Sequence, residues 1–150
     1  MANPNSSAPL SNLESILEEY FVKKAPFQLP AGAKEAIVKF GPWVMVVLLV
    51  MTLPILFAAL GLGAALLPAT MMAGYSPLYN VGMWISIASL VVEALALPGL
   101  FARKISGWRL AFYALLISVV ASLVMGQIVS VVLSGVIGLY ILFQVKSMYK

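Results

Sequence analysis

Residues 128–145 read IVSVVLSGVIGLYILFQV, an apolar run without a charged side chain. With a rise of about 1.5 Å per residue, a helix of this length nearly crosses the ~30 Å hydrocarbon core of a bilayer. Three further apolar runs precede it, and together they predict spans over residues 42–67, 81–100, 109–125 and 128–145. Residues 42–150 are therefore expected to form an all-α, four-helix transmembrane bundle in an integral membrane protein.

The composition of the whole chain supports this assignment. Of its 150 residues, 63% are hydrophobic and 9% are charged, whereas a soluble domain carries about a quarter charged residues. The chain contains no Cys and no His, the usual ligands of zinc, haem and iron–sulfur clusters. We therefore expect neither a metal nor a cofactor. No signal peptide is expected, because the first long apolar run begins only at Trp43.

The positions of the basic residues predict the threading. All nine Lys and Arg residues precede the first span, lie between the second and third, or follow the fourth. The positive-inside rule then places both termini and the middle loop in the cytoplasm. Interfacial aromatic residues fit the same threading, with Trp43, Trp108 and Tyr149 at the inner interface and Tyr75, Tyr79 and Trp84 at the outer one. The net charge of +4 is assigned to anionic lipid headgroups, and no nucleic acid is expected as a partner.

Residues 1–41 are expected to form a cytoplasmic leader and interfacial segment. Within residues 11–24, one helical face collects Leu13, Ile16, Leu17, Tyr20 and Phe21. The glutamates Glu14, Glu18 and Glu19 fall largely elsewhere. This pattern predicts an amphipathic helix lying on the cytoplasmic leaflet. A second short helix is expected over residues 33–40, with a new helix starting at Pro42.

Small residues predict where the spans pack, because in lipid they allow helix backbones to approach. They recur at four-residue spacing in the third and fourth spans, at Ala114, Ser118, Ser122 and Gly126 and then at Ser130, Ser134 and Gly138. Since a tight turn joins these spans, the two rows are expected to face each other.

Glu93 is the charged residue in the middle of a predicted span. It lies about 10 Å inside the membrane, where desolvation favours the neutral acid. Ser86 and Ser89 share its helical face, so this polar stripe should point into the bundle. Tyr113 and Tyr140 lie at a similar depth, and one of their phenols is expected to bond Glu93, in preference to Arg109.

Two functions remain open on this pattern. In the first, Glu93 fixes helix register or meets another subunit, and the chain is a non-enzymatic structural or accessory subunit of a homo-oligomer or a larger membrane complex. In the second, a small oligomeric transporter or channel uses Glu93 for proton or cation coupling, with an unidentified small molecule or ion as substrate. No enzyme is expected, because no acid–base pair or activated nucleophile accompanies Glu93.

Four segments carry a resemblance to known proteins. They are Tyr20-Phe-Val-Lys-Lys-Ala-Pro26, Leu97-Pro-Gly-Leu-Phe-Ala-Arg-Lys104, Ser106-Gly-Trp108 and Leu139-Tyr-Ile-Leu-Phe-Gln-Val-Lys146. In these segments the chain resembles a group of small bacterial membrane proteins with four helices and no assigned activity. The resemblance implies a multi-pass protein of the bacterial cytoplasmic (inner) membrane.

Overall fold

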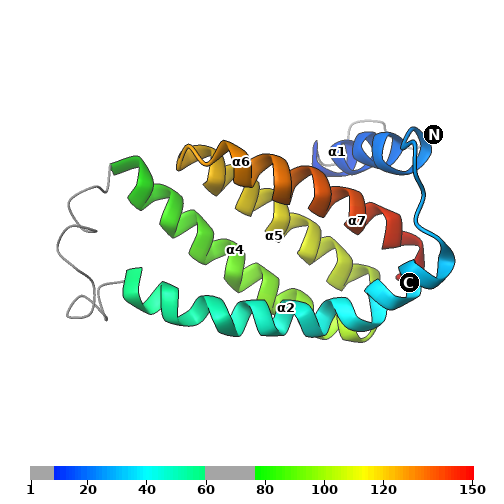
Figure 1. Cartoon of the computed structure of the whole chain (residues 1–150), viewed down its shortest axis with the longest axis horizontal. Helices are drawn as coiled ribbons and strands as arrows, with labels where there is room; N and C mark the ends of the chain where they lie inside the picture. The colour runs from blue at the N-terminus through cyan, green and yellow to red at the C-terminus, as the bar shows by residue number, and fades with distance from the viewer. Residues whose placement is uncertain (1–8, 60–76) are drawn as a thin grey trace, which may run out of the picture.

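The structure, a computed structural model, describes residues 9–59 and 77–150, and every regular element within them is helical (Figure 1). Within these residues, four helices are long and apolar enough to cross a membrane, namely Ala31–Pro54, Val81–Phe101, Ile105–Val124 and Ile128–Met148. The prediction of four apolar helices is therefore confirmed. The elements that form them are α2 (Ala31–Ala59), α4 (Pro77–Phe101), α5 (Ile105–Val124), α6 (Ile128–Ser130), η2 (Val131–Ile137), α7 (Gly138–Val145) and η3 (Lys146–Met148).

The first long helix differs from its prediction. A separate helix over residues 33–40 was expected, but α2 runs without interruption from Ala31 through Pro42. Gly41 removes one of the clashes of a proline within a helix, since the ring meets no Cβ on the preceding residue. The predicted end of this span, beyond residue 59, lies outside the described residues, as do Tyr75 and the side chain of Tyr79.

α4 and α5 form the closest pair of helices. A Cβ placed on Gly99 would lie 2.5 Å from the Gly107 Cα, so the two backbones touch at this point. Further along the pair, the Ser89 hydroxyl donates a hydrogen bond to the Ala114 carbonyl oxygen at 2.7 Å. A Cβ on Gly82 would collide with Met125. The contact between α4 and α5 thus extends over most of their length.

The fourth apolar helix, Ile128–Met148, packs on α5. It begins after a tight turn in which Gly126 has a φ of +72°, a conformation that suits glycine. Its middle, η2, is π-helical. Near its end, Phe143 joins Trp108 and Phe112 in a fully buried aromatic cluster, with the Trp108 and Phe143 ring centroids 5.3 Å apart.

Burial corrects one of the predicted interfacial residues. Trp108 was expected at the inner membrane interface, but its side chain is fully buried. The indole Nε1 is the one polar atom of this side chain. It donates a hydrogen bond to the Leu142 carbonyl oxygen at 2.8 Å and so needs no contact with water. Trp43 and Trp84, by contrast, are exposed on the surface of the bundle.

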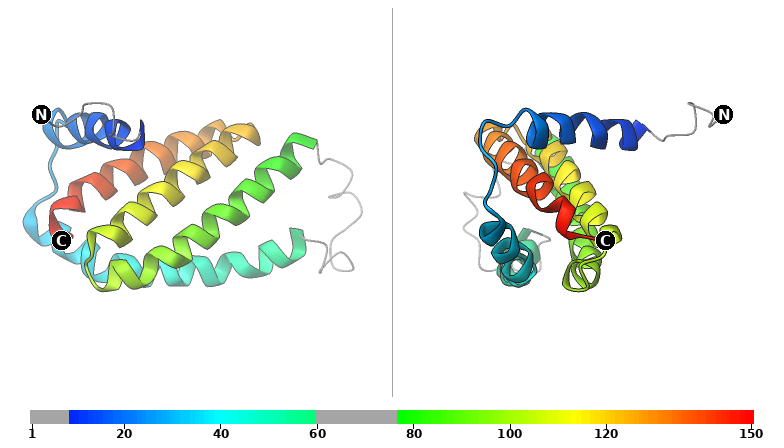
Figure 2. Two further views of the ribbon diagram at one scale, coloured as in Figure 1. Left: turned by 180° about the vertical axis from the view of Figure 1, so that it is seen from behind. Right: turned by 90° about the vertical axis from the view of Figure 1, so that its right-hand side faces the viewer.

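The chain before α2 lies against the ends of the other helices. It comprises α1 (Pro9–Glu18), the π-helical turn η1 (Glu19–Lys23) and an extended connection to Pro30. We call residues 9–30 the N-terminal strap. Figure 2 shows α1 beside α7, with its beginning projecting past the long helices. Leu17, Phe21 and Val22 of the strap pack on the aromatic cluster.

Candidate functional site: a crevice at Glu93

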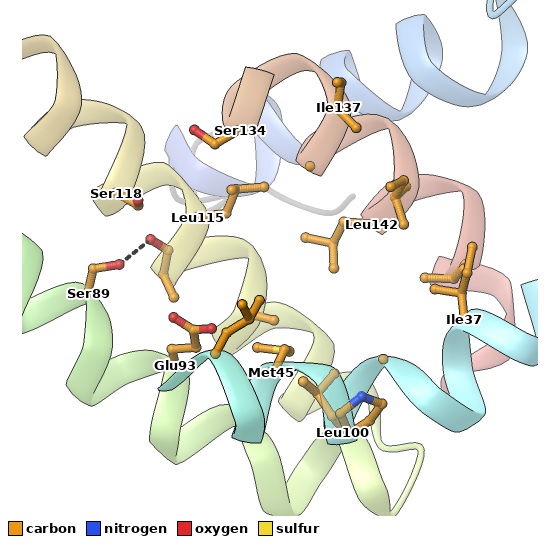
Figure 3. A pocket seen from close by; sticks show the side chains of 18 of the residues that line it. Ile37, Met45, Ser89, Glu93, Leu100, Leu115, Ser118, Ser134, Ile137 and Leu142 are labelled. Atoms are coloured by element: carbon orange, nitrogen blue, oxygen red, sulfur yellow. Dashed lines mark hydrogen bonds between the residues drawn. The ribbon is translucent and has the colours of Figure 1, made fainter. Parts of the chain in front are cut away.

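A crevice of about 500 Å³ lies among the four long helices. Its walls come from α2, α4, α5 and the η2–α7 helix, and they are mostly apolar (Figure 3). α5 packs on α4 and on the η2–α7 helix, and α2 contacts α4 and α7 (Figure 2). The crevice lies between α2 and α5, with side chains of α4 and of the η2–α7 helix completing its walls.

Glu93 lies in the wall of this crevice. Its side chain extends from α4 into the space, and the residue is half-buried (Figure 3). Among the residues that the structure describes, none donates a hydrogen bond to its carboxyl group and none forms an ion pair with it. The crevice thus holds an unpaired acidic group among apolar side chains, an arrangement that costs free energy unless a partner supplies a donor.

Neither tyrosine expected beside Glu93 bonds to it. The Tyr140 hydroxyl donates instead to the carbonyl oxygen of Phe27 in the N-terminal strap, at 2.6 Å. The Tyr113 ring packs against Phe112, with their centroids 5.7 Å apart, at the edge of the aromatic cluster. The equal depth predicted for these residues did not bring them together, because their side chains leave their helices in other directions.

The serines near Glu93 bond to backbone carbonyls. Ser89, which shares the crevice wall with Glu93, donates to Ala114 across the α4–α5 contact. Ser86 donates to the Gly82 carbonyl oxygen at 2.9 Å, one turn earlier in its own helix. The Ser134 hydroxyl, on the opposite wall, likewise donates to the Ser130 carbonyl oxygen. Ser118 also lines the crevice.

The predicted row of small residues meets larger side chains in the structure. A Cβ on Gly138 would lie 3.1 Å from Leu115, and one on Gly135 would lie 3.3 Å from Val119. Gly135 is buried and was not among the predicted residues. The remaining positions of the two rows have other surroundings. Ala114 is buried between α4 and α5, Ser122 is half-buried, Ser130 is exposed and Gly126 forms the turn.

Beyond the crevice, an ionic cluster joins the strap to the end of the fourth helix. The Lys146 Nζ lies 2.8 Å from a carboxylate oxygen of Glu14 and 2.6 Å from one of Glu18. The Arg109 Nε lies 3.9 Å from Glu14. Glu14 was expected to lie off the apolar face of its helix. It is buried instead, because it faces these basic groups.

Gln144 holds the connection between η1 and α2. Its side chain is 1% exposed, yet both of its polar atoms are satisfied. Nε2 donates to the Phe21 carbonyl oxygen at 2.9 Å, and Oε1 accepts from the Leu29 backbone N–H at 3.4 Å. In the sequence, Gln144 stands out only as a single amide side chain in an apolar helix. That pattern does not identify partners so distant in the chain.

A second set of contacts joins the loop between α4 and α5 to the last residues. The Lys150 N–H donates to the Arg103 carbonyl oxygen at 2.9 Å, and the Ile105 N–H donates to the Lys150 carbonyl oxygen at 2.7 Å. The Arg103 guanidinium pairs with Glu35 of α2 at 2.6 Å. Beside these contacts, burial raises the pKa of the Tyr149 phenol, and the positive charge of Arg103 partly opposes the shift.

Comparison with family models, with curated proteins and with solved structures finds no match for this chain.

Proposed function

We propose that the chain is a non-enzymatic accessory subunit of a membrane assembly, and that a helix of another polypeptide docks in the crevice at Glu93. The observation that carries the proposal is the Glu93 carboxyl, which has no hydrogen-bond or ion-pair partner among the described residues and lines an apolar space. A charged group at mid-membrane costs ~2.5–3.5 kcal/mol on insertion scales. A partner that supplies a hydrogen-bond donor or a positive charge would recover part of this free energy.

The lining of the crevice favours a helix over a lipid chain as its occupant. Gly41, Ala114 and Gly138 lie on three different walls, and small residues let the backbone of a neighbouring helix approach closely. A lipid acyl chain would fill the space but would leave Glu93 without a donor. A transmembrane helix can present a polar side chain at a fixed depth.

Coupled transport receives less support from the same geometry. A relay would need polar groups in a line from Glu93 to both ends of the helices. In the described part of the crevice, the Ser89 and Ser134 hydroxyls already donate to backbone carbonyls. The lining beside Glu93 then continues with apolar side chains, among them Met45, Leu100 and Leu142. We therefore favour docking over proton or cation coupling.

We also propose the location that follows from the basic residues and the resemblance. The chain would be a multi-pass protein of the bacterial inner membrane, with both termini in the cytoplasm. The ends of the described helices support a common side, because the strap, the α4–α5 loop and the last residues all contact one another or α2.

Photocrosslinking in the native membrane tests the proposal. A photoreactive residue replaces Met45, which lines the crevice, or Val47, which is exposed on the same helix but does not line it. We expect adducts with another membrane polypeptide from position 45 only, and we expect Glu93→Gln to weaken them. Native mass spectrometry of the extracted complex should show this chain together with a second polypeptide. A complex built from copies of this chain alone would contradict the accessory role, and an ion flux abolished by Glu93→Gln would favour the transporter.

A further inference from the structure

α1 presents three different surfaces around its axis. With about 100° between successive residues, Glu14 and Leu17 lie on the side that faces the bundle. There Glu14 pairs with Lys146, and Leu17 packs on the aromatic cluster. On one flank of this side lie Leu13 and Ile16, which are 37% and 51% exposed. The opposite flank carries the exposed polar residues Ser11 and Ser15, whereas Asn12 lies one turn before Ile16, between the two flanks.

This arrangement revises the amphipathic face expected from the sequence. Leu17 and Phe21 were expected to face lipid, but both pack against the protein. Only Leu13, Ile16 and Tyr20 of the expected face are left exposed. The apolar face is therefore divided between the bundle and the surroundings, and the ionic cluster fixes the rotation of the helix that makes this division.

The contacts of α1 also fix its level along the bundle. Lys146 directly follows α7, and Arg109 lies in the second turn of α5. The start of α5 and the end of α7 therefore lie at the same level of the bundle, because Glu14 approaches a basic residue at each of them. Figure 2 shows α1 at this level, beside the bundle, with its beginning extending past it.

We infer that α1 lies in the headgroup region of the adjoining leaflet, with Leu13 and Ile16 toward the acyl chains and Ser11 and Ser15 toward water. A helix beside a bundle at a membrane surface meets three environments, which are protein, lipid and water, and α1 has one surface for each. A protein partner that covered the helix would not require a polar flank opposite the apolar one. The exposed Lys23, which follows α1, suits anionic headgroups, whereas Lys24 pairs with Glu19.

The inference is independent of Glu93 and of any partner subunit, so it can be tested on the purified chain. Because the chain has no cysteine, single nitroxide labels can be placed at Leu13→Cys, Ile16→Cys, Ser11→Cys and Ser15→Cys without removing a native thiol. All four side chains are exposed, so labelling disturbs no core contact. The labelled protein is reconstituted in vesicles of phosphatidylethanolamine and phosphatidylglycerol.

The readout is the accessibility of each label to oxygen, which concentrates in the acyl region, and to a nickel chelate, which stays in water. We expect a severalfold higher oxygen-to-nickel ratio at positions 13 and 16 than at positions 11 and 15. A contrast that is unchanged when excess lipid dilutes the protein reports lipid and not a contact between copies of the chain. Equal ratios at the four positions would overturn the inference, whether all labels contact water or all are shielded.

Discussion

Lys146 and Glu14, from opposite ends of the chain, form an ion pair in which the Nζ and the carboxylate oxygen are 2.8 Å apart. Their side chains are only 21% and 11% exposed, so water screens the pair weakly. The Lys146 ammonium also lies 5.1 Å from the centroid of the Trp108 ring, which adds a cation–π contact. This position makes Lys146 the point at which the strap, α5 and the fourth helix meet.

A double-mutant cycle with Glu14→Gln and Lys146→Gln tests the pair. We expect a coupling free energy of about 1–2 kcal/mol, because the two groups meet in a poorly hydrated place and each single variant keeps only one other contact, Lys146 with Glu18 or Glu14 with Arg109. The measurement is reversible denaturation of the chain in mild detergent. The matched control is Glu19→Gln, which removes an exposed pair with Lys24 and should cause no measurable change. Additive effects of the two substitutions would show that the pair contributes nothing to stability.

Pattern reasoning could predict the four long helices but not these contacts. The long uncharged runs that form these helices can be recognised in the sequence itself, because few types of side chain are tolerated in lipid. Helical periodicity, however, assigns glutamates to water, and Glu14 is buried only because Lys146 and Arg109 approach it from other elements. Gln144 was missed for the same reason, because its partners Phe21 and Leu29 contribute backbone atoms that have no sequence signature.

The contact between Gly99 and Gly107 predicts a large effect of a small substitution. Gly99→Ala would place its Cβ 2.5 Å from the Gly107 Cα, and a backbone atom cannot move aside as a flexible side chain can. We expect α4 and α5 to separate and the chain to lose about 3 kcal/mol of stability or more. Gly32→Ala in α2 is the control, since nothing lies within 4 Å of its Cβ position, and it should be neutral or slightly stabilising. Similar melting temperatures for the two variants would disprove the close approach.

Glu93→Leu tests whether the carboxyl is unpaired in the isolated chain. Removing a polar group that lacks a donor, in favour of an apolar side chain, should raise the stability of the purified protein by about 1 kcal/mol. Thermal unfolding in lipid nanodiscs measures the change. The same substitution should weaken the crosslink formed from position 45 in native membranes. If Glu93→Leu instead destabilised the purified chain, the carboxyl would have a structural partner within it.

The crevice itself could not be predicted from the sequence. The polar stripe of Ser86, Ser89 and Glu93 was predicted to point into the bundle; in the structure Ser89 is buried against α5 and Glu93 lines the crevice. Which helix faces Glu93 depends on how far α2 stands from α5, and no local pattern encodes that distance. Small-residue spacing was similarly ambiguous, because Gly138 meets Leu115 and not another small residue.

Alkaline pH should destabilise the chain partly through Tyr149. Burial raises the pKa of its phenol in the folded protein, whereas in the unfolded chain it ionises near pH 10. The stabilising contribution is therefore complete below about pH 10 and is lost as the pH rises toward the higher folded pKa, because the unfolded state releases its proton first. We expect Tyr149→Phe to remove this component, so that its melting temperature falls less than that of the unchanged chain between about pH 9.5 and 11. Lysine titration affects both proteins in the same way. Melting curves that stay parallel throughout this range would mean that the phenol is as accessible to water in the folded protein as in the unfolded one.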